Sequence, residues 1–448
     1  MPAAVAALIL PACGGNNASS ESLSMPPMGA PRHATSSGKI QHVVVVIQEN
    51  RSLNNLFYGF HGATTAKYGY DSRGNQVEIK PLPLEAPGYA DHYSWSFFTA
   101  CNGTGSIPGT NCRMNGFNKE RVTDCQGKAE RCRRNYFPYS YVPHSETKPY
   151  FELGYQYVLA DQMFSSNFDS SSFVAHQYLI SAQAESSVNY PKLGEWGCPG
   201  GPNDTIAMVG PQRQIPDGHE VVCWDPTTLG DELDNAAITW GYYTATVKGD
   251  GNEWNAYQAI NHIYNGKDWT KDVITPQTQF FKDVSSGNLR AVSWITPTWA
   301  NSDHPHSLSK TGPSWVASIV NAIGESQYWD STVVFVLWDD YGGWYDSVAP
   351  TYVDYDGLGF RVPLLVLSAY AKKSHVSHVA YEFGSVLKFI EDVFGLPPMS
   401  ASDARANSPA QDCFDFTKPP RTFVPIQSPY DARYFERQPL DLHPLDEY

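Results

Sequence analysis

The chain has 448 residues, of which 42% are hydrophobic and 13% are aromatic, so it can bury a sizeable core. By length it could hold two or three domains, although large α/β enzymes often form one. Its formal net charge of -15 at pH 7 argues against a surface that binds nucleic acid or an anionic membrane.

The N-terminal segment predicts an exported protein. Residues 3–10, AAVAALIL, are apolar but too few to span a bilayer as a helix, and they run into PACGG. This pattern resembles a bacterial lipoprotein signal over residues 1–13, with Cys13 as the residue to be lipidated. Residues 14–38 are rich in Gly, Ser, Asn and Pro and predict a flexible tether. We therefore expect a periplasmic or extracellular protein that reaches the membrane only through a lipid anchor at Cys13.

The first strong strand signal ends in two polar residues. Residues 43–47 form an unbroken β-branched run, which is typical of a strand buried on both faces of a parallel sheet. Glu49 and Asn50 come just after it, and such sheets bind their ligands at the carboxyl ends of their strands. The alternative is a strand that simply stops, with the Asn-Arg-Ser triplet that follows opening a helix as caps.

The region from residue 66 to residue 150 differs from the rest of the chain. Gly, Pro, Cys and Tyr are frequent there and hydrophobic periodicity is weak. We interpret it as a long irregular insertion over the site, within a single domain that spans residues 39–448.

Cysteine usage also favours an oxidising compartment. The pairs favoured by short intervening loops are Cys101–Cys112, Cys125–Cys132 and Cys198–Cys223, with Cys413 left over. A zinc site would need tighter, repeated spacing with histidine partners, which the sequence lacks.

The remainder of the chain alternates between strand and helix signals. Apolar runs predict strands near residues 156–160, 237–245, 291–296 and 362–368. Helical periodicity appears in HQYLISAQAE, GPSWVASIVNAIGES and YEFGSVLKFIEDVFG. Strands that alternate with helices predict a three-layer α/β/α sandwich with a mostly parallel central sheet.

A cluster of serines precedes the first of these helices, in FDSSSFVAHQ. A hydroxyl at a helix N-terminus lies where free amides and the helix dipole attract an anion, and beside a metal it can attack phosphorus. The alternative is plain N-capping by Ser170, Ser171 or Ser172.

A second buried run, residues 333–337, ends in Asp339 and Asp340 and is followed by a Gly-Gly pair that lets the backbone turn tightly. Two strands would thus bring Glu49, Asn50 and both aspartates to one edge of one sheet, where three carboxylates need compensation. We therefore predict one divalent metal ion, and oxygen ligands suit Mg, Ca or Mn. The alternative is that the aspartates only cap the turn.

Long blocks of the sequence resemble one protein family. In chain order they are IQHVVVVIQENRSLNNLFYGF, FVAHQYLISAQAE, WITPTWANSDHP, GPSWVASIVNAIGES, VLWDDYGGWYDSVAP and YEFGSVLKFIEDVFGLP. They resemble the bacterial phosphoesterase family that contains AcpA-type acid phosphatases and phosphatidylcholine-type phospholipases C. The resemblance implies an alkaline-phosphatase-like α/β/α fold and hydrolysis of phosphate esters through a phosphorylated Ser or Thr.

The resemblance also assigns roles to single residues. It implies that Ser172 is the nucleophile and that His304 and His92 are active-site histidines, which contact the phosphoryl group or the leaving oxygen. It further implies a metal held by Glu49, Asn50, Asp339 and Asp340. The chain departs from the family pattern at Asn54, at Asp346-Ser347 and near TWGYYT, where paired histidines have no clear counterpart.

We therefore expect a metal-dependent hydrolase of small phosphate monoesters, an acid phosphatase with a phosphoserine intermediate. The larger lipases of the family continue into further β domains, for which little chain remains after residue 425. One alternative is a phospholipase C, because 12 Trp and 27 Tyr could provide aromatic faces for a choline head group. Another is a non-catalytic surface-binding lipoprotein, against which the complete set of predicted site residues argues.

Overall fold

The computed structural model describes Met1 and residues 38–85, 87–123 and 136–440. The chain divides into two units, Met1–His33 and Ala34–Tyr448, and every element below belongs to the second. The predicted signal with Cys13, nearly all of the predicted tether and the pair Cys125–Cys132 lie outside the described residues. Within the described part, no helix combines the length and apolar character needed to cross a bilayer.

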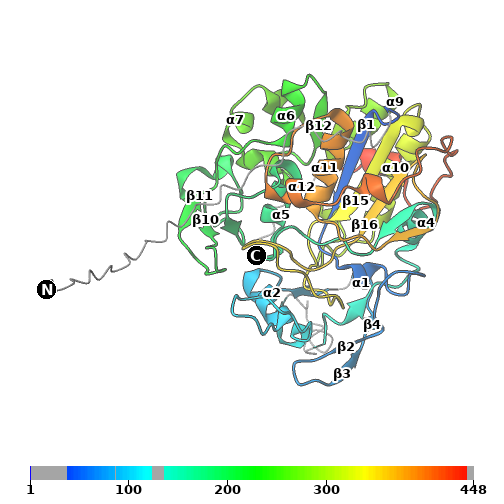
Figure 1. The fold of residues 1–448 in the computed structure, drawn as a ribbon. Coiled ribbons are helices and arrows are strands. Elements are labelled where there is room, and N and C mark those ends of the chain that lie inside the picture. Colours follow the sequence, from blue (N-terminus) through cyan, green and yellow to red (C-terminus); the bar gives the residue numbers. More distant parts are fainter. Residues whose placement is uncertain (2–37, 86, 124–135, 441–448) are drawn as a thin grey trace. The chain divides into compact units, whose positions relative to one another are not determined.

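A central sheet of eight described strands organises this unit (Figure 1). Its strands, in spatial order, are β13 (Val273–Ile274), β12 (Trp240–Tyr243), β14 (Val292–Ile295), β1 (His42–Gln48), β15 (Thr332–Trp338), β16 (Leu364–Ser368), β8 (Val158–Ala160) and β17 (His375–Ser377). Only β16 runs against its neighbours β15 and β8, so the sheet is mostly parallel, as predicted. Each predicted strand coincides with one of these elements; β1 and β15 extend one residue beyond the predicted runs at each end, and the other four are shorter than predicted.

Helices cover both faces of the sheet and complete the predicted α/β sandwich (Figure 1). The helices α4 (Lys148–Gln156), α9 (Gln279–Ser285) and α13 (Ala432–Glu436) pack against α10 (Gly312–Gly324). A second group comprises α5 (Ser172–Ser181), α6 (Leu229–Asn235), α11 (Phe383–Phe394) and α12 (Ala401–Arg405). The remaining described α-helices are α1 (Leu53–Leu56), α2 (Ser94–Cys101), α7 (Asn261–Tyr264) and α8 (Asp268–Lys271).

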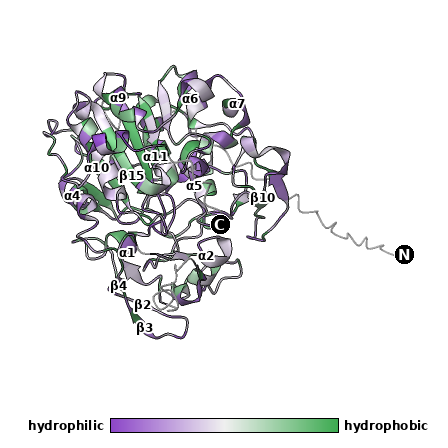
Figure 2. Cartoon of the chain, turned by 180° about the vertical axis from the view of Figure 1, so that it is seen from behind, coloured by the Kyte–Doolittle hydropathy of each residue, from purple (hydrophilic) through white to green (hydrophobic). Residues whose placement is uncertain are grey.

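The central strands form the core because β-branched and aromatic side chains fill both of their faces. All seven residues of β15 and six of the seven residues of β1 are buried. Figure 2 shows hydrophobic residues concentrated on β15 and the strands around it. Such two-sided burial is what an unbroken apolar run requires.

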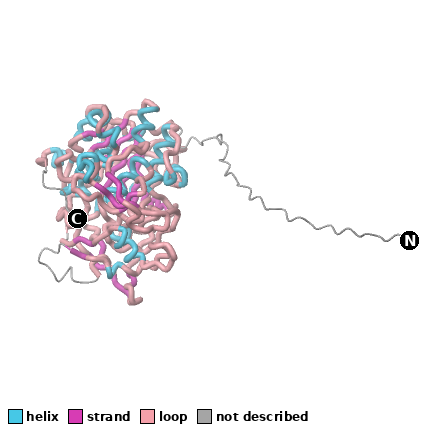
Figure 3. The backbone as a smooth tube through the Cα atoms, turned by 90° about the vertical axis from the view of Figure 1, so that its left-hand side faces the viewer, coloured by secondary structure: helices cyan, strands magenta, loops and turns pink. Residues whose placement is uncertain are grey.

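In its described residues, the segment from residue 66 to residue 150 contains mostly short elements. They are β2 (Tyr68–Tyr70), β3 (Gln76–Glu78), β4 (Lys80–Pro81), β5 (Tyr89–Ala90), β6 (Val122–Thr123), β7 (Ser140–Tyr141) and α2. Figure 3 shows that loops, drawn in pink, make up much of the described backbone. An aromatic cluster joins this segment to the chain just before β16, since the rings of Phe97 and Phe360 lie 4.6 Å apart. Periodicity did not predict α2, whose sequence SWSFFTAC has apolar residues all round.

A further small sheet follows α5, and two of its three strands, β10 and β11, lie between the disulfide-bonded Cys198 and Cys223. Its strands are β9 (Ser187–Val188), β10 (Thr205–Met208) and β11 (His219–Val221). The structure confirms Cys101–Cys112 and Cys198–Cys223 as disulfides and Cys413 as a free, buried thiol. Disulfides are typical of proteins from oxidising compartments.

Two departures from the family pattern have structural roles. Asp346 forms a buried ion pair with Arg361 at 2.8 Å, and its other oxygen accepts a hydrogen bond from the backbone of Asn54. The side chain of Asn54 in turn accepts from the backbone N–H of Ala66 at 2.6 Å and donates to the Ala66 carbonyl. These contacts hold α1, which follows β1, against the start of the 66–150 segment.

We expect Asp346→Ala to lower the free energy of unfolding by about 3 to 5 kcal/mol, because it leaves the Arg361 guanidinium buried without its carboxylate. Urea denaturation followed by tryptophan fluorescence measures the change. The matched control is Glu152→Ala, which removes the surface pair with Lys148 and should cost less than about 1 kcal/mol. Equal shifts in both variants would contradict the structural role of Asp346.

Candidate active site

The carboxyl ends of β1 and β15 bring the predicted acidic residues together. The two strands pair in parallel with Gln48 opposite Trp338, so Glu49 and Asp339 follow at the same edge of the sheet. The backbone N–H of Asn50 donates to Asp339 Oδ1 at 3.0 Å. Two runs almost 300 residues apart in sequence therefore deliver one polar cluster, as the strand pattern predicted.

The backbone at this edge turns sharply on both strands. Asn50 has a φ of 55° and Gly342 has a φ of 61°, both in the left-handed region, which asparagine and glycine tolerate best. A Cβ at Gly342 would lie 2.0 Å from the carbonyl oxygen of Asn50. Only glycine therefore allows the loop after β15 to approach the end of β1 this closely.

Helix α5 supplies the candidate nucleophile. Its N-cap is Ser171, whose hydroxyl accepts from the backbone N–H of Val174 at 3.4 Å. Ser172 is consequently the first helical residue, and its hydroxyl takes no part in the cap. Its Oγ instead lies 3.4 Å from Glu49 Oε2 and 3.4 Å from Asp340 Oδ2. Of the three serines left open by the sequence, Ser172 is the one with its hydroxyl among the carboxylates.

These carboxylates are buried, and within the described residues their ion-pair partners are histidines and not lysine or arginine. Burial, followed by repulsion from Asp339, raises the pKa of Glu49 well above its usual range. The same two causes, in the same order, raise the pKa of Asp340 well above its usual range. Each additional negative charge is therefore disfavoured, and a cation would relieve this repulsion.

The donor set fits a divalent cation. Asn50 Nδ2 donates to Asp340 Oδ2 at 3.0 Å and to a ring nitrogen of His92 at 2.8 Å, which fixes the orientation of its amide. Its Oδ1 is buried without a hydrogen-bond partner, and so is Asp339 Oδ2. Unpartnered buried acceptors beside a carboxylate cluster are what a metal ion would satisfy. Glu49, Asn50, Asp339 and Asp340 are thus suited to hold one.

His92 lies in the 66–150 segment and reaches this cluster from the loop that follows β5. Its Nδ1 lies 3.0 Å from the carbonyl of Ala90, which can only accept, so Nδ1 carries the proton. Its Nε2 then accepts from Asn50. Burial lowers the pKa of His92 to about 4, so the ring is neutral near pH 7.

His304 lies in the loop after β14, next to His92. The two imidazole centroids are 6.2 Å apart, and the His304 ring packs on Trp299 at 4.3 Å. Its Nδ1 lies 2.5 Å from the carbonyl of Pro305, which fixes the proton on that nitrogen. Burial, followed by the nearby His92, lowers the pKa of His304 well below its usual range.

His176 lies at the same carboxylates, although the sequence analysis did not single it out. It occupies α5 one turn after Ser172, and its Nε2 lies 3.0 Å from Glu49 Oε1. A histidine four residues after the candidate nucleophile lies on the same helix face, and this spacing could have identified it.

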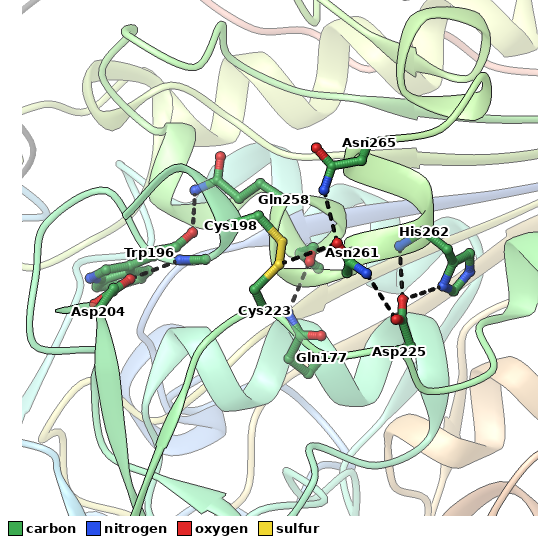
Figure 4. The surroundings of a disulfide bond; sticks show 12 residues. Gln177, Trp196, Cys198, Asp204, Cys223, Asp225, Gln258, Asn261, His262 and Asn265 are labelled. Atoms are coloured by element: carbon green, nitrogen blue, oxygen red, sulfur yellow. Dashed lines mark hydrogen bonds and ion pairs between the residues drawn. A yellow bond between two sulfur atoms is a disulfide. The ribbon is translucent and has the colours of Figure 1, made fainter. Parts of the chain in front are cut away.

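The segment after α5 packs over the cluster and is anchored by the second disulfide. Tyr190 OH accepts from the Ser172 backbone at 3.4 Å and lies 3.4 Å from His92 Nε2. Figure 4 shows the Cys198–Cys223 disulfide, with Gln258 beside it, whose side chain donates to the carbonyl of Trp196 at 2.7 Å. This disulfide cross-links the chain that follows Tyr190.

Comparison with known proteins identifies the family of the chain. A model of the phosphoesterase family matches residues 40–397 of the chain. Phospholipase C B of Mycobacterium tuberculosis is 27% identical over 44% of this chain and 44% of that protein. Non-hemolytic phospholipase C of Pseudomonas aeruginosa is 24% identical over 88% of this chain and 60% of that protein. Both alignments cover less than two thirds of the relative's own length.

Among solved structures, one described as a member of the alkaline phosphatase superfamily, from Vibrio parahaemolyticus, is 11% identical. It superposes with a TM-score of 0.36 over 86% of this chain and 71% of that chain. The family model spans β1, α5, β14, β15 and α11, and so includes every element that delivers a residue to the cluster. The family suggested by the sequence blocks is confirmed, and the chain belongs to the phosphoesterase family.

Proposed function

We propose that this protein hydrolyses phosphoric esters through a phosphoserine formed on Ser172. The observation that carries the proposal is the position of Ser172 Oγ, 3.4 Å from Glu49 Oε2 and from Asp340 Oδ2, while Ser171 provides the helix cap. A serine hydroxyl that does not cap its helix and lies beside carboxylates able to bind a metal ion can be activated as a nucleophile.

The reaction has two balanced steps. In the first, Ser172 Oγ bonds to phosphorus, loses its proton and displaces the alcohol, which leaves as its P–O bond breaks. In the second, water attacks the phosphoserine, inorganic phosphate leaves and Ser172 regains its proton. A divalent cation, when bound by Glu49, Asn50, Asp339 and Asp340, supplies charge that lowers the serine pKa and shields the phosphoryl oxygens.

His304 and His92 complete the proposal as proton carriers. In the neutral form of each ring, Nδ1 carries the proton and donates it to a backbone carbonyl. Nε2 can therefore accept a proton but has none to donate. The negative charge of a bound phosphoryl group, or an acidic medium, favours the doubly protonated ring. His304 or His92 can then protonate the leaving oxygen, which suits an acid phosphatase.

Ser172→Ala should reduce turnover by roughly 10³-fold or more, because no other group can form the covalent intermediate. The fold and metal content should not change, since Ser171 provides the cap. Steady-state hydrolysis of an aryl phosphate, together with elemental analysis, measures both quantities. Ser171→Ala is the matched control and should lose stability by about 1 kcal/mol while keeping activity. An inactive Ser171→Ala beside an active Ser172→Ala would contradict the assignment.

His304→Gln should slow hydrolysis of alkyl phosphates by roughly 10²-fold, because their alcohols need a proton to leave. Hydrolysis of nitrophenyl phosphate should change much less, since nitrophenolate leaves without one. The ratio of the two kcat values in variant and wild type is the measurement. Parallel loss on both substrates would indicate that His304 only binds the phosphoryl group.

We further propose that the substrates are small phosphate monoesters. The side chains of Ser172, His92 and His304 are fully buried, which suits a compact phosphate ester better than a long-chain lipid. The net charge of -15 would also oppose binding to anionic bilayers. A phospholipase C activity is the second candidate, because the relatives described above bear that name.

A substrate panel separates the two candidates. Between about pH 5 and about pH 7, an aryl phosphate should be hydrolysed much faster than its phosphocholine ester or dispersed phosphatidylcholine. Ser172→Ala serves as the background for each substrate. A preference for the phosphocholine ester would favour the phospholipase C candidate.

A further inference from the structure

The imidazole of His176 is directed into the carboxylate cluster from α5. Its Nε2 lies 3.0 Å from Glu49 Oε1 and 3.9 Å from Asp339 Oδ2. The side chain is 1% exposed, and both carboxylates are completely buried. One ligand atom from each of these three residues lies within 4.8 Å of the other two.

Neighbouring groups fix which nitrogen of His176 carries the proton. Tyr242 OH donates to the carbonyl of Trp254 at 2.7 Å, so its oxygen is left to accept. His176 Nδ1 lies 3.4 Å from that oxygen and donates its proton to it. The lone pair of the neutral ring is therefore on Nε2, the atom that faces Glu49.

This arrangement brings hydrogen-bond acceptors of His176, Glu49 and Asp339 close together without a donor between them. The Nε2 lone pair of His176 faces Glu49 Oε1, while Asp339 Oδ2 is buried without a hydrogen-bond partner. A proton on Glu49 could satisfy one of these contacts, but it would leave Asp339 Oδ2 without a donor. One cation among the three atoms would satisfy all of them.

We propose that His176 Nε2 is a further ligand of the metal ion, alongside Glu49 and Asp339. This inference rests on the metal-dependent function proposed above. It changes the expected donor set from oxygen alone to oxygen with one imidazole nitrogen, which favours borderline ions such as Fe²⁺ and Zn²⁺ over Mg²⁺ and Ca²⁺.

Tyr242 acts as a positioning residue in this site. Histidine ligands of metals donate their second nitrogen to a nearby acceptor, which fixes the tautomer and the ring orientation. Tyr242 comes from β12, two strands away from β1 in the sheet, and is fully buried. The sheet thus holds both the carboxylates and the acceptor that orients the imidazole.

Metal titration of the full chain tests the inference. Wild type, His176→Gln and His219→Ala are stripped with a chelator and titrated with Zn²⁺ and, separately, with Mg²⁺. His176→Gln should weaken Zn²⁺ binding at least about tenfold and leave Mg²⁺ binding nearly unchanged, because only the nitrogen donor is lost. His219→Ala is the control, since His219 is an exposed residue of β11 and should bind both ions as wild type does.

Pulsed EPR of the Mn²⁺-loaded protein gives a readout that is independent of activity. Nitrogen coupling to the metal should be present in wild type and in His219→Ala and should be lost in His176→Gln. Tyr242→Phe, which keeps the ring volume, should retain the coupling but bind Zn²⁺ more weakly. This second variant keeps the test valid if His176→Gln does not fold.

The outcomes separate the two proposals. If wild type binds neither ion, both the metal-dependent function and the role of His176 are overturned. If wild type binds metal but shows no nitrogen coupling, or if His176→Gln keeps the coupling and the wild-type Zn²⁺ affinity, only the role of His176 is overturned. The same holds if Tyr242→Phe binds Zn²⁺ as wild type does when His176→Gln is unfolded.

Discussion

The rest of the site depends on the mutual repulsion of three buried carboxylates where β1 and β15 end. Glu49, Asp339 and Asp340 are each fully buried, and the ion-pair partners observed for them are His92 and His176. Burial and repulsion raise the pKa of Glu49 and Asp340 well above their usual range. Hydrophobic burial of the two strands holds the cluster together against this repulsion.

Local hydrogen bonds position Ser172 and Asn50 and leave one polar atom of each side chain directed at the carboxylates. Ser171 satisfies the N-terminus of α5, so the hydroxyl of Ser172 remains free to contact the carboxylates. Asn50 uses both amide protons and leaves its oxygen without a partner. Ser171 caps the helix in place of Ser172, and the amide protons of Asn50 make its hydrogen bonds. The atoms that face the cluster are therefore the Ser172 hydroxyl, which can act as a nucleophile, and the Asn50 oxygen, which can bind a metal ion.

Several parts of the chain that are remote in sequence must be held in place for this arrangement. His92 comes from the 66–150 segment, whose described elements are mostly short, and it is tied to the cluster through Asn50. The buried pair of Asp346 and Arg361 braces the start of that segment through Asn54. The Cys198–Cys223 disulfide cross-links the chain that follows α5. These contacts hold the segments that surround the proposed site.

The sequence by itself determined the sheet and the residues at its edge. Unbroken apolar runs identify buried strands, and the residue that follows such a run must lie at a strand end, so Glu49, Asn50, Asp339 and Asp340 were predictable from local pattern. The cysteine spacing likewise predicted the two observed disulfides. The reversed direction of β16 was not predictable, because an apolar run has the same pattern in either direction.

Only the tertiary structure decided which side chains meet at that edge. Ser170, Ser171 and Ser172 have the same capping chemistry, and the rotation of α5 against the sheet selects Ser172 for the carboxylates. His176 was missed because its role depends on the distance from α5 to Glu49 and on Tyr242 from another strand. A sequence pattern records the face of a helix, whereas these contacts depend on how that face packs against strands distant in the chain.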